Sequence, residues 1–223
     1  MRLAPPSRSA TRSARVPGLA PAGVLNYSPP VAAVYCALIH HPVLDRQGNE
    51  VTTSVTNLDV HDIARTARTY GLRGYFVVVP IEAQHPVVHK IIDHWSTGAG
   101  VTRFPERMEA IRLVRLAHSL EASIADIAER EGEMPRLVAT SAKGGPDRSA
   151  YAEERARIDA ETRPTLILFG TGHGISPRIL ETCDAILAPI EGPTEYNHLS
   201  VRAAAAVTLD RLFGTKSPAK NPI

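Results

Sequence analysis

The chain has 223 residues, of which 43% are hydrophobic, so it is long enough for one globular domain with a sizeable core and too short for two large ones. No apolar stretch approaches the roughly 20 residues of a membrane span, and the two cysteines, Cys36 and Cys183, argue against a disulfide framework and for a reducing compartment such as the cytoplasm. The formal net charge is +2, but four arginines lie before Val16 in a segment without acids, so the remainder sums to −2 and is not a generally basic RNA binder.

The first 30 residues differ in composition from the rest of the chain. They are rich in Pro, Ala, Ser and Arg and lack hydrophobic periodicity, which predicts a disordered extension. Arginines without acids also occur in organellar transit peptides, but prolines at positions 5, 6, 17 and 21 interrupt an amphipathic helix. Residues 215–223 are expected to form a short C-terminal tail.

From residue 31 onward, apolar runs of strand length alternate with helical patterns. Strands are expected at 31–39, 74–81, 137–140, 166–169 and 185–190, and helices at 59–70, 83–95, 118–130, 151–160, 177–183 and 200–213. Continuous apolar runs indicate strands that are buried on both faces, and helices between them indicate parallel pairing. The pattern therefore predicts one α/β domain over 31–214, with a parallel sheet flanked by helices. A turn at 45–49 joins the first strand to a segment at 51–56.

Polar residues follow the first strand and open the first helix. His40 and His41 stand at a strand end before Pro42, where histidine is more often structural than catalytic. Asn57 then precedes a helical segment that contains Arg65 and ends at an aromatic residue followed by Gly71.

Two later strand ends have the composition of a small-molecule cradle. Phe169–Ile175 reads FGTGHGI and places three glycines where an apolar strand gives way to a loop, and glycine lets the backbone come close to a ligand there. The strand at 185–190 runs into Glu191-Gly192, after which Asn197–Ser200 opens an alanine-rich helix. Both strand ends would deliver open backbone and helix-start donors to one place.

These segments resemble, in order, the three motifs of the SpoU-TrmD (SPOUT) superfamily of S-adenosylmethionine-dependent RNA methyltransferases. Asn57–Gly71 resembles motif 1, Phe169–Ile175 resembles motif 2 and Ile186–Phe213 resembles motif 3. The nearest likeness is to a bacterial SAM-dependent RNA methyltransferase domain family that begins near a His-x-Pro-Val segment, here His40–Val43, and the likeness covers roughly Val34–Gly214. The resemblance implies a C-terminal half tied in a trefoil knot that binds the methyl donor.

The resemblance also implies which residues bind S-adenosylmethionine. In the family, main-chain groups of the loops after motif 2 and before the motif 3 helix hold the adenine, and the end of an earlier strand makes a third wall. The matching residues here are Thr140, Ser141 and Ala142; Phe169, Gly170, Thr171, Gly172, His173 and Gly174; Pro189, Ile190, Glu191 and Gly192; and Asn197, His198, Leu199, Ser200 and Val201. No metal is expected.

Motif 1 is expected to face the RNA. The resemblance implies catalytic roles for Asn57, Asp59 and Arg65, in which the arginine activates or orients the acceptor, with the general base open among Asp59, His61, Asp62 and water. Three departures leave open whether a base nitrogen or a ribose 2′-oxygen is methylated: the Asn57-to-Arg65 spacing is one residue shorter than usual, Gly172 stands where many members carry glutamate, and His198 stands where asparagine is common. The implied substrate is tRNA, with rRNA second, and a homodimer would bring motif 1 of one subunit near the donor of the other.

Local arginine clusters are the parts of the chain that would hold RNA. The sequence offers Arg65/Arg68/Arg73 and Arg103/Arg107/Arg112/Arg115, although each is also compatible with a solvated helix face. Asp62, three residues before Arg65, is a possible partner for it.

Two other functions are compatible with the same residues. A non-catalytic RNA- or nucleotide-binding module would keep the cradle without the chemistry. A Rossmann oxidoreductase that uses NAD would explain glycines after a strand and an acid about twenty residues later, at Glu191. The glycine spacing is GxGxG rather than GxGxxG, however, and only one clear strand follows it, which disfavours that class.

Overall fold

One all-parallel sheet of six strands forms the centre of the computed structural model, which describes residues 32–97 and 104–215. The tails predicted at 1–30 and, apart from Thr215, at 215–223 lie outside the described residues. The strand order is β5-β4-β1-β7-β6-β8. The strands are β1 (Val34–Ile39), β4 (Gly74–Val78), β5 (Val114–Ala117), β6 (Arg136–Ala139), β7 (Thr165–Gly170) and β8 (Ala185–Ile186).

Helices connect the strands, and a small antiparallel hairpin follows β1. The hairpin consists of β2 (Val43–Leu44) and β3 (Glu50–Val51). The helices are α1 (Asn57–Thr69), the 3₁₀ turn η1 (Glu82–Gln84), α2 (His85–Ser96), α4 (Pro105–Ile111), α5 (Leu120–Glu131), α6 (Tyr151–Ala160), α7 (Pro177–Leu180) and α8 (Val201–Phe213).

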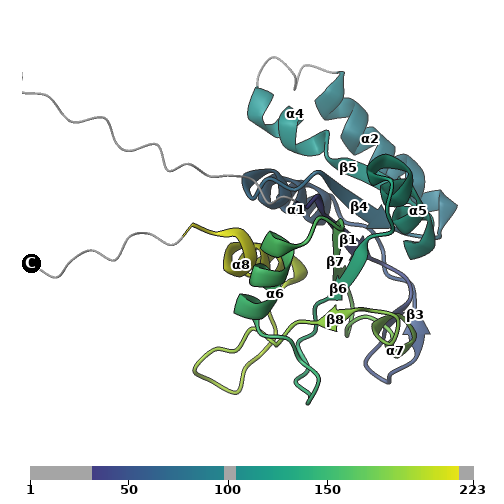
Figure 1. Ribbon diagram of the computed structural model, residues 1–223. Coiled ribbons are helices and arrows are strands. Elements are labelled where there is room, and N and C mark those ends of the chain that lie inside the picture. The colour runs from purple at the N-terminus through teal and green to yellow at the C-terminus, as the bar shows by residue number, and fades with distance from the viewer. Residues whose placement is uncertain (1–31, 98–103, 216–223) are drawn as a thin grey trace, which may run out of the picture.

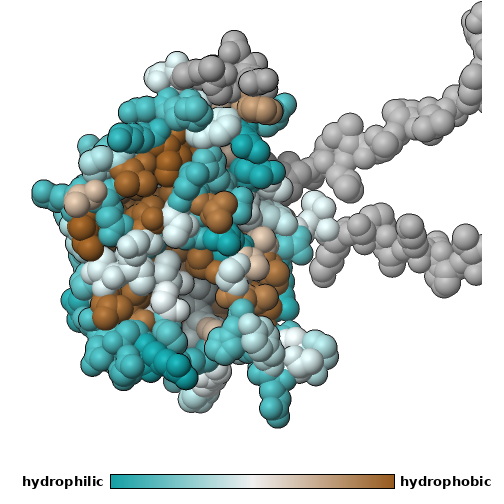
Figure 2. All heavy atoms as spheres, turned by 180° about the vertical axis from the view of Figure 1, so that it is seen from behind, coloured by the Kyte–Doolittle hydropathy of each residue, from teal (hydrophilic) through white to brown (hydrophobic). Residues whose placement is uncertain are grey.

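The helices cover both faces of the sheet, so the molecule has three layers (Figure 1). One core, around Cys36, Leu38 and Val77, packs against α1, α2, α4, α6 and α8. The second core, around Ala37, Ile39 and Leu168, packs against α5, α7 and the hairpin. Strands covered on both faces are apolar at consecutive positions, which confirms the predicted parallel α/β fold. Seen from behind, hydrophobic residues also reach the surface in several patches among hydrophilic ones (Figure 2).

The structure differs from the sequence-based elements at the two edges of the sheet, around β5 and β8. Strand β5 and helix α4 were not predicted, because Arg115 interrupts the apolar run of a short edge strand and α4 has only seven residues. Strand β8 ends at Ile186 instead of residue 190, because Ala188 turns its N–H to the carbonyl of Ser149 and Pro189 has no N–H to donate. Helix α7 ends at Leu180, three residues before the expected end.

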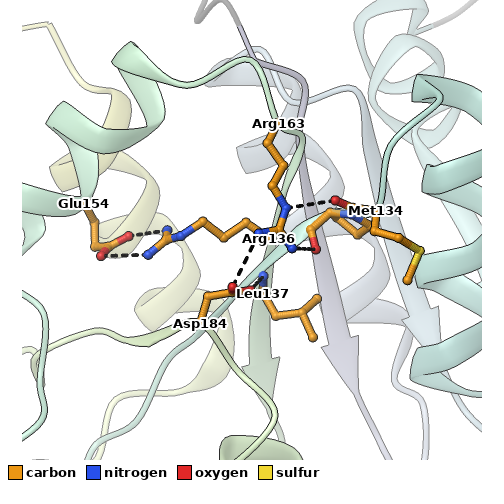
Figure 3. A network of polar contacts seen from close by, with 7 residues as sticks. Met134, Arg136, Leu137, Glu154, Arg163 and Asp184 are labelled. Carbon is orange, nitrogen blue, oxygen red and sulfur yellow. Dashed lines mark hydrogen bonds and ion pairs between the residues drawn. The ribbon is translucent and has the colours of Figure 1, made fainter.

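A polar network ties the amino ends of β6, β7 and β8 together (Figure 3). Arg136 at the start of β6 donates to both carboxylate oxygens of Glu154 in α6, at 2.5 and 3.1 Å, and these side chains are only 4% and 2% exposed. Arg163, just before β7, donates to the carbonyls of Met134 and Pro135. Asp184, just before β8, accepts from the Leu137 N–H at 2.8 Å. The network fixes the relative positions of these three strands, and therefore of the loops at their opposite ends.

Candidate functional site

Three predicted site segments meet at the carboxyl edge of the sheet. Strand β6 lies between β7 and β8, and all three run parallel, so the motif 2 loop after β7, the Thr140–Ala142 segment after β6 and the motif 3 loop after β8 leave the sheet side by side. Thr140 is bound directly to β7, because its N–H and its Oγ1 both donate to the Leu168 carbonyl, at 3.0 and 2.9 Å. This edge of an α/β sheet is where ligands commonly bind.

Motif 3 crosses back to the loop after β6. The Asn197 amide donates to the Ala142 carbonyl at 3.0 Å, and the Ala188 N–H donates to the Ser149 carbonyl at 2.9 Å. From Ile190 to Leu199, backbone N–H groups donate no hydrogen bond to any other described part of the chain. Free backbone groups require a partner from water or a ligand. The segment therefore presents a row of unused donors and acceptors beside the loop after β6, at the same edge of the sheet as motif 2.

The helix within motif 3, α8, begins at a capped, solvent-facing end. The Ser200 hydroxyl accepts from the Ala203 N–H at 3.3 Å and so serves as the N-cap of α8, with Val201 as the first helical residue. His198, Leu199 and Ser200 are exposed, and Leu199 remains 50% accessible despite its apolar side chain.

The glycines of motif 2 serve the backbone in different ways. Gly172 has φ +58°, and a Cβ atom on it would lie 2.7 Å from the Leu44 carbonyl oxygen in β2. The two residues after Gly172 bind the same strand residue: the His173 N–H donates to the Leu44 carbonyl and the Gly174 carbonyl accepts from the Leu44 N–H, each at 2.9 Å. The motif 2 loop is therefore seated on the β2–β3 hairpin, so the need for glycine at 172 comes from local packing as well as conformation.

Gly192 does not share this constraint. Its φ lies outside the left-handed region, and a Cβ atom on it would stand in open space. Glycine at 192 is therefore not required for backbone freedom, because its loop stands away from the sheet and no described element packs on it, and the expectation that it is needed for close approach to the ligand stays a prediction. Phe169 differs from the other predicted donor-binding residues in that its side chain is 1% exposed and lies in the core, so only its main chain is available to a ligand.

A buried hydrogen-bond chain lies beneath the motif 2 loop. The Thr171 hydroxyl donates to the Ile39 carbonyl at 3.1 Å and is also within 2.5 Å of the Thr53 hydroxyl, which is 3.0 Å from His40 Nδ1. Since Thr171 donates to the carbonyl, Thr53 donates to Thr171, and His40 donates through Nδ1–H to Thr53. His40 Nε2 is then a buried acceptor, and it has no partner within the described residues. Burial lowers the pKa of His40 to about 4, against a smaller opposite effect of Asp59.

Motif 1 begins with a capped helix rather than a loop. Asn57 was expected in a loop, but it is the first residue of α1, because Thr56 caps the helix. The Thr56 hydroxyl accepts from the Asp59 N–H at 3.2 Å and donates to the Asp59 carboxylate at 2.7 Å. Asp59 is buried as a result, whereas Asn57 is exposed.

Arg202 is the site residue that the sequence analysis missed. From the first turn of α8 it donates to Asp59 at 2.7 Å and reaches Asp62 at 3.5 Å, so it joins motif 3 to motif 1 within one subunit. The expected pairing of Asp62 with Arg65 is wrong, because Asp62 faces Arg202. One signal was present: Arg202 is the only charged residue between the Ser200 cap and Asp210.

Arg65 lies farther along α1 than Asn57 and Asp59. It is exposed on α1, two turns after Asn57, and forms no ion pair with a described residue. Eight helical residues correspond to a rise of about 12 Å. The structure therefore brings Asn57 and Asp59 to the start of α8, and leaves Arg65 farther along the helix.

Carboxylates neutralise three of the six arginines of the predicted clusters that the structure describes. Arg68 pairs with Glu109, Arg73 with Glu131 and Arg115 with Asp126. Arg103 lies outside the described residues. Arg65, Arg107 and Arg112 have no ion-pair partner in the part of the chain that the structure describes.

Residues 32–97 and 104–215 hold neither a metal-binding cluster nor a membrane-spanning helix. No group of three or more His, Cys, Asp or Glu side chains in these ranges is arranged to hold a metal ion. No helix there combines the length and the apolar character needed to cross a membrane. Cys36 is buried and Cys183 half-buried, and both are free thiols.

Comparisons with known proteins add evidence from outside the chain. Residues 33–214 match the family model described as SAM-dependent RNA methyltransferase. The chain is 46% identical over 190 residues to a tRNA (guanine-N(1)-)-methyltransferase of Nitratidesulfovibrio vulgaris. The matched region covers 85% of this chain but only 44% of that protein. The chain is also 46% identical over 180 residues to an uncharacterised protein of Aquifex aeolicus, covering 81% of this chain and 88% of the other. A solved methylase family structure from Neisseria gonorrhoeae has the same fold, with a TM-score of 0.55, 15% identity and coverage of 90% and 89%.

Proposed function

The chain belongs to the SAM-dependent RNA methyltransferase family, and we propose that it transfers a methyl group from S-adenosylmethionine to RNA, with tRNA as the favoured substrate. The observation that carries the proposal is the meeting of three loops at the carboxyl edge of β7, β6 and β8, next to the paired residues Asp59 and Arg202. The protein would work in the cytoplasm, in keeping with an RNA substrate and two free thiols.

The residues at this edge fit the methyl donor. Its adenine, ribose and amino acid portions carry donors and acceptors that suit main-chain groups. The unused N–H groups from Ile190 to Leu199 and the exposed Gly172 and His173 follow strands that end at the same edge of the sheet. Gly174 in the motif 2 loop and Gly192 in the motif 3 loop both leave open space where a side chain would stand. We propose that these loops, with Thr140–Ala142 as the third wall and a C-terminal trefoil knot holding them, bind the donor.

The chain's own contribution to the reaction is positioning and proton handling. A bound sulfonium donor supplies an already activated methyl group, so the protein has to orient an RNA nucleophile and exclude water. Arg202 and Thr56 hold both carboxylate oxygens of Asp59 in one orientation. In the proposed mechanism Asp59 takes the proton of the acceptor, and Asn57 orients the acceptor from the exposed start of α1. Arg65 binds the RNA phosphates around the acceptor.

A homodimer is part of the proposal. Arg65 lies about 12 Å along α1 from Asn57, which favours action on RNA that is held against a second subunit. The apolar side chains Leu58, Tyr196 and Leu199 are 59%, 75% and 50% exposed on the two segments that the Asp59–Arg202 pair joins. Exposed apolar groups around a site of this kind are suited to burial in a subunit interface.

The acceptor atom is left open in the proposal. The chain spans less than half the length of the Nitratidesulfovibrio relative, so the guanine N1 activity named for that protein does not identify the part that performs it. Base nitrogen and ribose oxygen therefore stay as alternatives for this chain.

Titration calorimetry tests the donor site directly. We expect S-adenosylmethionine, or its demethylated product, to saturate one site per subunit, and NAD to give no heat at the same concentrations. Tight NAD binding with no response to either methionine compound would instead place the protein among dinucleotide-binding enzymes.

A further inference from the structure

Helices α1, α2 and α4 pack together (Figure 1), and aromatic and basic side chains gather where they meet. Trp95, near the end of α2, meets His61 of α1 edge-on with ring centroids 5.4 Å apart. Phe104, just before α4, lies 6.1 Å from Trp95 between ring centroids. The guanidinium carbon of Arg107 lies 5.2 Å from the Trp95 ring centroid and 5.4 Å from that of Phe104. We call these four residues, with Arg65, the α1–α4 aromatic cluster.

The cluster has more apolar exposure and more positive charge than packing of the helices requires. Phe104 is 45% exposed. Arg107 and Arg65 have no carboxylate partner among the described residues, whereas the neighbouring Arg68 is paired with Glu109. Burial, followed by the charge of Arg107, lowers the pKa of His61, and Arg65 acts in the same direction. Both guanidinium groups therefore lie close to His61 and remain available to an anionic partner.

The cluster is also continuous with the proposed active site. Asn57, His61 and Arg65 are spaced by four residues along α1, so they lie on one side of the helix. His61 is one turn, about 6 Å, from Asn57. Nucleotides stacked about 3.4 Å apart would span the rise from Asn57 to His61 within about two nucleotides.

We propose that the α1–α4 aromatic cluster is a stacking platform for unpaired nucleotides that flank the methylated one. Exposed rings and planar guanidinium groups bind single-stranded RNA by stacking on its bases, while the unpaired arginines attract the phosphates. An RNA that presents its target in a loop or bulge fits this surface, and a continuous duplex does not, because its bases are already stacked. The inference rests on the proposed function for its substrate class but concerns a separate surface.

The test uses the fluorescence of Trp95, the only tryptophan in the chain. A single-stranded ten-nucleotide oligoadenylate should quench Trp95 emission in the full-length protein, and a duplex of equal length at the same salt concentration should quench it much less. Phe104→Ala and Arg107→Lys should each weaken binding of the single strand by about fivefold or more, since lysine keeps the charge but loses the stacking plane. Arg112→Ala is the matched control, because Arg112 is an exposed arginine at the end of the same helix, and it should change affinity by less than twofold.

Three outcomes would overturn the platform: equal affinity for single strand and duplex, equal loss in the Arg112 and Arg107 variants, or Trp95 emission that changes with protein concentration alone. The last result would identify the partner as a second copy of the chain. Methyl transfer measured on the same variants separates this proposal from the proposed function. A wild-type protein that stacks RNA but transfers no methyl would refute only the function, and normal RNA affinity in Phe104→Ala and Arg107→Lys would refute only the platform.

Discussion

At the scale of single residues, the site depends on partners that are distant in sequence. Asp59 and Arg202 are separated by 143 positions, and His40 is tied to Thr171 through Thr53. The motifs predicted segments that the structure brings together at one edge of the sheet, but a pattern along the chain does not indicate which side chain an arginine faces after folding. For this reason the sequence identified Asp59 and missed Arg202.

Arg65 is the residue on which chemistry and donor binding should separate. We expect Arg65→Ala to reduce methyl transfer to unmodified tRNA by a factor of about 100, as for loss of a positioned electrostatic group. Donor affinity should change little, because Arg65 is remote from the β7, β6 and β8 loops of its own subunit. Single-turnover methylation and calorimetry on one preparation measure both. Normal turnover would mean that Arg65 is an ordinary surface charge, and lost donor affinity would mean that motif 1 is placed on the wrong side of the site.

His40 should make stability depend on pH. Its pKa is about 4 in the folded protein, against 6.5 when it is exposed. Because the unfolded chain takes up this proton first as pH falls, the contribution is complete above pH 6.5 and is lost progressively down to pH 4. The loss between pH 7 and pH 5 is about 2 kcal/mol.

Urea denaturation of the wild type and of His40→Asn at both pH values isolates this contribution. Asparagine retains a donor toward Thr53 but does not titrate, so the wild type should lose about 2 kcal/mol more than the variant. Parallel pH dependence in the two proteins would show that His40 is not held neutral by its burial.

At the scale of structural elements, the buried strands were the most predictable part. β1, β4 and β7 are covered on both faces and read as continuous apolar runs, whereas β5 at the sheet edge and the two-residue β8 carry too few buried positions to be recognised or bounded. The packing of the motif 2 loop on the β2–β3 hairpin could not be predicted from the sequence either, because it depends on main-chain contacts between segments about 130 residues apart.

Valine substitutions at two loop glycines should have different effects. Gly172→Val places a side chain against the Leu44 carbonyl at a positive φ, so it should cost about 1–2 kcal/mol or more in stability and weaken donor binding at least tenfold. Gly192→Val fills open space at an ordinary φ, so stability should change little and any loss of affinity reports contact with the donor. Thermal unfolding and calorimetry measure these quantities. Equal stability of the two variants would contradict the seating of motif 2 on the hairpin.

The Arg136–Glu154 pair should be essential for holding β6 to α6. Glu154→Gln leaves the Arg136 charge buried without its partner and should destabilise the protein by about 3–5 kcal/mol. The double variant Arg136→Met/Glu154→Leu removes both charges and should recover most of this loss. Chemical denaturation checks both, and a single variant as stable as the wild type would show that the pair is not isolated from water.

At the scale of the whole molecule, the proposed dimer would bring motif 1 of one subunit near the methyl donor of the other. We expect light scattering of the protein to report a dimer at micromolar concentration, because Leu58, Tyr196 and Leu199 remain exposed around the site. Leu58→Asp and Leu199→Asp should shift the species toward the monomer, with Val87→Asp as a control at an apolar residue exposed elsewhere, on α2. A monomer that methylates RNA at the full rate would contradict an active site completed by two subunits.

The central claim is that this chain methylates RNA at the carboxyl edge of β7, β6 and β8. Mass spectrometry of nucleosides from the tRNA and rRNA of a deletion strain, complemented with the wild type or with Arg65→Ala, tests it most directly. We expect one methylated nucleoside to disappear on deletion, to return with the wild type and to stay largely absent with the variant. An unchanged nucleoside profile after deletion, with no methylation of that RNA by the purified protein, would contradict it.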